Sequence, residues 1–184
     1  MFMTQISRKI LLISGSGRSV GKTSFMRRVI SKNASQHLVA IKITPHFHEP
    51  TQGLVSLFET KNYRIYQETD ITASKDSSLF LQAGAETVYY IQSTDAFLEE
   101  AFNLATEQLV PEQPIIVESV RLRNILAPEL FIFIQKDFEE VNPSALEMQK
   151  LAEVVVLSDS GQFSVDPATI TFDENWNFQT SDKD

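Results

Sequence analysis

The chain has 184 residues, of which 42% are hydrophobic and 22% are charged, and its formal net charge is −8. These values fit one globular domain, residues 1–184, with a core of ordinary size, and they exclude wholesale disorder. The acidic balance argues against a nucleic-acid-binding protein, which normally carries a basic face.

The chain has no cysteine. Disulfides and thiolate metal sites are therefore excluded, and a reducing compartment is favoured, so we expect a cytoplasmic protein. Residues 1–9 hold no apolar run typical of a signal peptide. No later segment approaches the roughly 20 apolar residues that cross a bilayer, so we expect no membrane segment.

Short apolar runs alternate with helical stretches in the first half of the chain. The predicted elements are, in chain order, strand 9–14 (KILLIS), helix 23–32 and strand 38–44 (LVAIKIT). From 45 to 74, polar residues and turn formers interrupt the pattern, and we expect a variable insertion or mobile region. A short helix over 75–83 then ends at Gly84, a residue type common at helix C-termini.

The second half continues this alternation. The predicted elements are, in chain order, strand 87–92, helix 94–109, strands 114–118 and 129–134, helix 144–152 and a last central strand 153–157. Residues 169–172 predict an edge strand, and 173–184 a polar tail. Strands that alternate with helices predict a three-layer α/β fold, in which helices flank a mostly parallel central sheet. Ligands of such folds bind at the carboxyl ends of the strands.

The segment between the first strand and the first helix has the features of a phosphate-binding loop. Small residues let successive backbone N–H groups face an anion, and the helix that follows offers unpaired donors and the positive end of its dipole. Lys22 is placed to reach the β- and γ-phosphates, and the Thr23 hydroxyl to bind Mg²⁺. We therefore expect a P-loop NTPase fold, with a nucleotide bound by Gly15, Gly17, Arg18, Ser19, Val20, Gly21, Lys22, Thr23 and Ser24.

The spacing of this loop departs from the usual pattern. Four residues normally separate its two glycines, whereas Gly15 and Gly21 are separated by five, and Ser16 stands at the usual glycine position. The longer spacing resembles the dethiobiotin synthetase branch of P-loop enzymes. The alternative, a Gly/Ser turn with a chance Lys-Thr pair, is disfavoured by the strand before it and the helix after it. The loop does not distinguish GTP from ATP.

Other polar residues stand where they could contact such a ligand. Glu118 ends a buried-type strand and would hold Mg²⁺, unless it only terminates the strand. Asp76 opens a helix, where it either answers the helix dipole or contacts Mg²⁺ or substrate. Lys42 needs a phosphate or carboxylate partner if it is buried, and the alternative is a lysine that extends from an edge strand to water. His46 and His48 fit a polar loop near the substrate better than a zinc site.

Taken together, the motifs resemble the MobB family, the accessory nucleotide-binding proteins of molybdopterin-guanine dinucleotide biosynthesis. The matching stretches are Gly21-Lys22-Thr23, Ala40 to Thr44 with His46 and His48 beyond it, Lys75-Asp76-Ser77, Ala83-Gly84-Ala85 and Val117-Glu118. The distance from Asp76 to Ala83 is the one typical of the family, and the order and spacing of the motifs cover about two-thirds of the chain.

The resemblance implies a GTP-binding, weakly hydrolysing homodimer that assists a nucleotidyltransferase or another molybdopterin-binding partner. In this interpretation Lys22 and Glu118 have the catalytic roles, and Thr23, Glu118 and Asp76 serve Mg²⁺. Lys42 and His46 would face the substrate. Two other hypotheses stay open: an ATP-dependent ligase or kinase of the dethiobiotin synthetase type, and a non-hydrolysing adaptor that holds nucleotide to control a partner.

Overall fold

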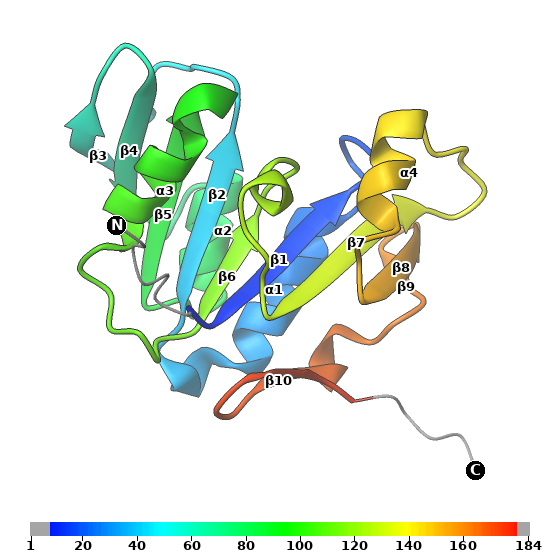
Figure 1. The fold of residues 1–184 in the computed structure, drawn as a ribbon. Helices are drawn as coiled ribbons and strands as arrows, with labels where there is room; N and C mark the ends of the chain where they lie inside the picture. The colour runs from blue at the N-terminus through cyan, green and yellow to red at the C-terminus, as the bar shows by residue number, and fades with distance from the viewer. Residues whose placement is uncertain (1–7, 180–184) are drawn as a thin grey trace, which may run out of the picture.

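The computed structural model describes residues 8–179, which are built on a nine-stranded sheet (Figure 1). Its strands are, in order across the sheet, β3 (Leu54–Glu59), β4 (Tyr63–Glu68), β5 (Thr87–Ser93), β2 (Val39–Thr44), β6 (Ile115–Glu118), β1 (Ile10–Gly15), β7 (Leu130–Lys136), β8 (Val154–Asp159) and β9 (Gln162–Phe163). From β5 to β8 all neighbours are parallel, and β3, β4 and β9 add antiparallel edges. The carboxyl ends of β2, β6, β1, β7 and β8 therefore meet at one edge of the sheet.

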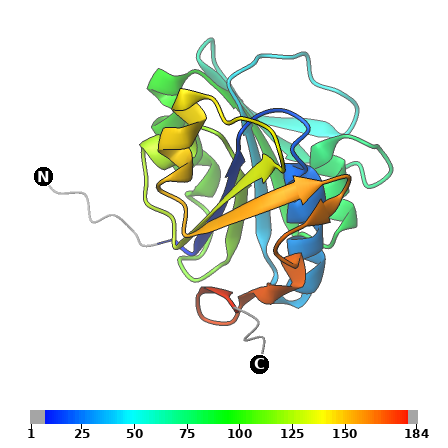
Figure 2. The same cartoon turned by 90° about the vertical axis from the view of Figure 1, so that its right-hand side faces the viewer.

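Helices cover both faces of the sheet (Figure 2). One face carries α1 (Lys22–Lys32) and α2 (Asp76–Gln82), and the other carries α3 (Leu98–Thr106) and α4 (Pro143–Gln149). Side chains of β1 alternate between the two cores, with Leu11 and Ile13 on the α1 side and Ile10 and Leu12 on the α3 side. Burial of both faces accounts for the unbroken apolar run of this strand. The predicted α/β fold, with a mostly parallel sheet flanked by helices, is confirmed.

The region predicted as an insertion or mobile segment, 45–74, contains β3 and β4. These strands form an antiparallel hairpin that continues the sheet beyond β5. The sequence pattern hid them because neither strand alternates regularly between buried and exposed residues. Nearly all of β3 is exposed, whereas β4 buries Tyr63, Ile65, Tyr66 and Glu68.

The end of the chain also differs from its prediction. The expected edge strand at 169–172 corresponds to β10 (Ile170–Phe172), which pairs with β11 (Trp176–Phe178) in a separate two-stranded sheet. Trp176 packs edge-on against Phe172 and is buried in the core on the α1 side. Residues 173–179 of the expected polar tail thus contain a core residue, and 180–184 lie outside the described residues.

The other predicted elements are present with shifted ends. The strand expected at 153–157 as a last central strand is β8. It lies between β7 and the edge strand β9, and is therefore not central. The helix expected at 94–109 is shorter, because a 3₁₀ turn precedes α3 and the helix ends at Thr106. The 3₁₀ turns are η1 (Ala34–Gln36), η2 (Asp95–Phe97), η3 (Leu122–Asn124) and η4 (Pro167–Thr169). Among the described residues, no helix is long and apolar enough to cross a bilayer.

Candidate functional site

The predicted phosphate loop connects the end of β1 to the start of α1 at the carboxyl edge of the sheet. A Cβ at Gly15 would lie 2.5 Å from the Ile134 carbonyl oxygen of β7, so only glycine fits there. The next backbone amide, Ser16 N–H, donates to that same oxygen at 3.0 Å. Gly21 adopts φ +93° immediately before α1, in the left-handed region that favours glycine. Both ends of the loop are thus fixed by glycine and backbone contacts.

The Lys22 side chain folds back over this loop. Its Nζ donates to the Gly17 carbonyl oxygen at 2.6 Å. Burial lowers the pKa of Lys22 below its ordinary value, and the nearby Glu118 only partly opposes that shift. The amine therefore lies against the backbone of the predicted phosphate loop, at Gly17.

Thr23 and Glu118 meet beside the loop. The Thr23 hydroxyl donates to Glu118 Oε2 at 3.4 Å, and Glu118 is only 6% exposed at the end of β6. The position follows from sheet register, since Glu118 aligns with Ile13 of β1 and with Lys42 of β2. A hydroxyl and a carboxylate in contact are oxygen ligands that suit Mg²⁺, which usually takes one or two protein carboxylates together with phosphates and water.

Lys42 joins this pair to α2. Its Nζ contacts Glu118 Oε1 at 3.1 Å and also pairs with the Asp76 carboxylate. Burial by itself lowers the pKa of Lys42, but the two carboxylates outweigh it and raise that pKa above 10.5. In the structure the partners of Lys42 are therefore carboxylates, and Asp76 contacts this lysine from the first turn of its helix.

The predicted residues are not all brought together. Thr23, Glu118, Lys42 and Asp76 form one connected group. The Lys22 side chain bonds instead to the Gly17 carbonyl oxygen, and the His46 side chain is exposed on the loop after β2. The ring centroids of His46 and His48 are 6.2 Å apart. Within residues 8–179 there is no group of three or more histidine, cysteine, aspartate or glutamate side chains that could hold a metal ion.

Sequence reasoning missed Glu68, which fixes the segment around Asp76. Its side chain is fully buried, and its carboxylate accepts from Ser77 Oγ at 2.5 Å and contacts Lys75 Nζ at 3.0 Å. The backbone N–H groups of Thr69 and Asp70 donate to the same carboxylate. Lys75 and Ser77 flank Asp76 in the chain, so Glu68 holds Asp76 in place from both sides. No sequence signal marked Glu68, because the strand that carries it was not recognised.

Ser158 at the end of β8 was missed as well. Its hydroxyl donates to the Val20 carbonyl oxygen at 2.7 Å, which connects the middle of the loop to the far half of the sheet. A signal was available, because Ser158 is a small polar residue at the carboxyl end of an apolar strand. Glu118 was predicted as a site residue for the same reason, since it also stands at the carboxyl end of an apolar strand.

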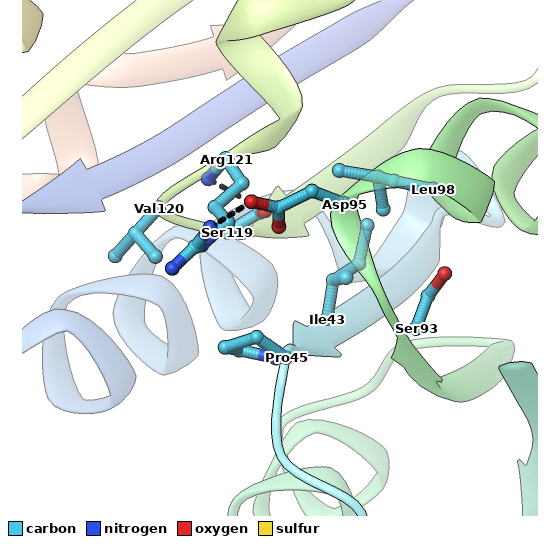
Figure 3. Close-up of a pocket in the computed structure, with 8 residues that line it drawn as sticks. All are labelled: Ile43, Pro45, Ser93, Asp95, Leu98, Ser119, Val120 and Arg121. Carbon is cyan, nitrogen blue, oxygen red and sulfur yellow. Dashed lines mark hydrogen bonds and ion pairs between the residues drawn. The ribbon is translucent and has the colours of Figure 1, made fainter. Parts of the chain in front are cut away.

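Two hollows adjoin the site. The larger is a cleft of about 450 Å³ between the loop and the ends of β7 and β8, lined by Ser19, Val20, Gly21, Ser24, Lys136, Asp137, Glu139, Ser158, Asp159, Ser160, Gly161 and Phe163. The smaller lies at the ends of β2, β5 and β6, where Figure 3 shows two of its lining residues, Asp95 and Arg121, in an ion pair. The loop therefore lines the larger cleft, whereas none of residues 15–23 lines the smaller hollow.

One solved structure supports the fold. The chain is similar to the crystal structure of the "apo" form of LpxK from Aquifex aeolicus in complex with ATP, with a TM-score of 0.50 and 18% sequence identity. The match covers 82% of this chain and 48% of that chain, so this chain spans about half the length of LpxK. No protein-family model and no curated protein matches the chain. At this identity the similarity establishes the α/β architecture.

Proposed function

We propose that this chain binds the triphosphate of a nucleotide, together with Mg²⁺, in the loop from Gly15 to Thr23. The observation that carries the proposal is the arrangement around that loop: the Lys22 amine lies over it, and the Thr23 hydroxyl contacts the Glu118 carboxylate beside it. An ammonium, a helix N-terminus and a pair of oxygen ligands at one place are what a Mg²⁺-bound phosphate chain requires.

Each residue of the site has a separate role in this proposal. Lys22 exchanges the Gly17 carbonyl for phosphate oxygens, and the loop amides neutralise the remaining charge. Thr23 and Glu118 would hold Mg²⁺, which would supply charge neutralisation to the phosphates. Lys42 pairs with both Glu118 and Asp76, and Lys42 and Asp76 would position the group that meets the terminal phosphate. Catalysis by such a site rests on positioning and on charge neutralisation.

The finer hypothesis is a MobB-like GTP-binding accessory factor with weak hydrolysis, acting in the cytoplasm as a homodimer in molybdenum cofactor biosynthesis. It rests on the resemblance of the sequence motifs, several of which lie in the connected group around Lys42. Under this hypothesis the partner is a nucleotidyltransferase or a molybdopterin-binding protein. Residues 1–184 would form a single nucleotide-binding domain.

The alternative is an ATP-dependent ligase or kinase of the dethiobiotin synthetase type. Two observations favour it: the five residues between Gly15 and Gly21, and the ATP in the similar LpxK structure. A third candidate, a non-hydrolysing adaptor, differs from both in lacking turnover.

Calorimetric titration of ATP and GTP, with and without Mg²⁺, tests the proposal. The wild type is compared with Lys22→Ala, and with Lys32→Ala as a control at the exposed far end of the same helix. We expect Mg²⁺-dependent binding that Lys22→Ala weakens at least tenfold and Lys32→Ala leaves unchanged. Equal affinity in the Lys22 variant would overturn the site, and a preference for ATP would count against the MobB-like hypothesis. Phosphate release measured on the same samples separates an enzyme from an adaptor.

A further inference from the structure

The Lys42 ammonium holds a carboxylate that the proposed function assigns to Mg²⁺. Its Nζ lies 3.1 Å from Glu118 Oε1 and pairs with the Asp76 carboxylate as well. The second Glu118 oxygen, Oε2, accepts from the Thr23 hydroxyl at 3.4 Å. Glu118 thus has one oxygen on a cation of the chain itself and the other on the second proposed Mg²⁺ ligand. An ion that bound Glu118 would have to share the carboxylate with Lys42 or displace the lysine.

Of these two partners, Lys42 is the one that can move. Glu118 is the last residue of β6 and is buried, so the packing around it holds its carboxylate. Lys42 lies opposite Glu118 in β2, but its ammonium stands at the end of a flexible four-carbon stem and has three donors that can turn to new acceptors. Exchange of its partners therefore needs only a new side-chain rotamer and leaves the pairing of β2 with β6 intact.

The charges around this contact cancel. Glu118, Lys42 and Asp76 are close enough to Lys22 for their charges to act on its pKa, so two ammonium groups and two carboxylates share the site. A divalent cation added alone would leave an excess of positive charge in a partly buried place, where charges interact more strongly than in water. A triphosphate chain brings negative charge that offsets the ion. The balance therefore favours the metal when it binds together with phosphates.

We propose that Lys42 is an exchangeable counter-ion, which excludes a free divalent ion and yields Glu118 to a Mg²⁺-phosphate complex. As that complex binds, the Lys42 ammonium leaves Glu118 Oε1, keeps its contact with Asp76 and turns to a phosphate oxygen. The inference rests on the proposed function and adds to it a means of regulation, because the ion and the ammonium compete for one carboxylate. Since the two cations exclude each other, removal of the ammonium must strengthen the binding of a free divalent ion.

Free Mn²⁺ is the probe, because it prefers the same oxygen ligands as Mg²⁺ and its unbound form is measured by electron paramagnetic resonance. The ion is titrated without nucleotide or phosphate against the wild type and its variants. Lys42→Met removes the ammonium, and Lys42→Arg keeps its charge. The double variant Lys42→Met with Glu118→Gln also removes the charge of the contested carboxylate. Lys61→Met is the matched control, because it removes one positive charge at an exposed position between β3 and β4.

We expect Lys42→Met to bind Mn²⁺ about 5- to 150-fold more tightly than the wild type, the usual range for coupling between two binding events. Lys42→Arg and Lys61→Met should bind it like the wild type, and the double variant should lose the gain. Equal affinity in Lys42→Met and the wild type would overturn the inference. A gain that persisted in the double variant, or that Lys61→Met shared, would also overturn it, since the contested carboxylate would then not be the cause.

Loss of this ion pair also lowers stability, so the folded state of Lys42→Met is followed by urea denaturation with and without Mn²⁺. An ion that takes the place of the ammonium stabilises the folded state to which it binds. It should therefore raise the urea midpoint of Lys42→Met and leave that of the wild type unchanged. A midpoint of Lys42→Met that did not respond to Mn²⁺ would contradict the exchange. This measurement needs only an unfolding transition, so it stays decisive if part of the variant is unfolded.

Inorganic tripolyphosphate with Mg²⁺, measured by calorimetry, separates this inference from the proposed function. Suppose that the wild type binds it, that Lys22→Ala weakens the binding, and that Mn²⁺ affinity is the same in the wild type and Lys42→Met. The proposed function would then stand, and the exchange at Lys42 would be refuted. A wild type that bound neither tripolyphosphate nor nucleotide would remove the proposed function itself, and the inference with it.

Discussion

The two sides of the candidate site are built by different means. The predicted phosphate loop is a short continuous segment, residues 15–23, whose shape is set by two glycines and by backbone hydrogen bonds. The side around Lys42 gathers charged groups from β2, α2 and β6, which are far apart in the chain and are held by ion pairs. The first side depends on local conformation and the second on balanced charge. A single substitution should therefore disturb the second side more, because it leaves another buried charge without its partner.

The largest effect is expected for Lys42→Met. The change removes the partner of Glu118, which is nearly fully buried, and that of Asp76, which is partly exposed. Breaking a buried pair costs about 3–5 kcal/mol, and the exposure of Asp76 brings our expectation to about 3 kcal/mol of unfolding free energy. Urea denaturation checks this value, with Lys61→Met as an exposed control. Adding Glu118→Gln to Lys42→Met should restore part of the unfolding free energy, because it removes the unpaired charge. If the double variant instead lost as much unfolding free energy as the two single variants added together, the ion pair would not be what stabilises this side.

The same ion pairs have a signature in pH. The folded state raises the pKa of Lys42 above its ordinary value of 10.5. The stabilisation is thus fully present below about pH 10 and is lost as the pH rises through the folded-state pKa. The difference in unfolding free energy between wild type and Lys42→Met should be constant from pH 7 to 10 and should shrink above that range. A difference that instead grew with pH would assign the effect to another group.

A smaller loss, about 2 kcal/mol, is expected for Glu68→Ala. The change leaves two backbone N–H groups, Ser77 and Lys75 without their common acceptor, and hydrogen bonds to a charged group contribute about 1.5–3 kcal/mol. Urea denaturation gives the value, and Glu140→Ala at an exposed position after β7 is the control. Affinity for tripolyphosphate should change less than twofold, because Glu68 supports Asp76 and not the loop. A large loss of that affinity would mean that the two sides are not independent.

The contrast between the two sides also explains what the sequence could predict. Lys22 and Thr23 were identified from neighbouring residues, and Glu118 from its place at the end of an apolar strand. The pairing of Lys42 with Glu118 was not predictable, because it depends on β2 lying beside β6, which adjacent residues do not encode. The role of Glu68 was not predicted because the hairpin of β3 and β4 was not predicted. The buried and exposed residues of that hairpin do not alternate with a period of two. The burial of Trp176 was not predicted, because its partners in the core are far from it in the sequence.

The smallest effect concerns the side-chain hydrogen bond from Ser158 that connects the loop to β8. Ser158→Ala removes the donor to the Val20 carbonyl oxygen in a buried setting, and we expect a loss of about 1 kcal/mol in unfolding free energy. Ser31→Ala, at an exposed position on α1, should stay within about 0.5 kcal/mol of wild type. Because Gly15 and Gly21 set the ends of the loop without Ser158, tripolyphosphate affinity should fall less than threefold in calorimetry. A fall of tenfold or more would show that the loop depends on a distant side chain as strongly as the Lys42 side does, and the distinction between local conformation and balanced charge would fail.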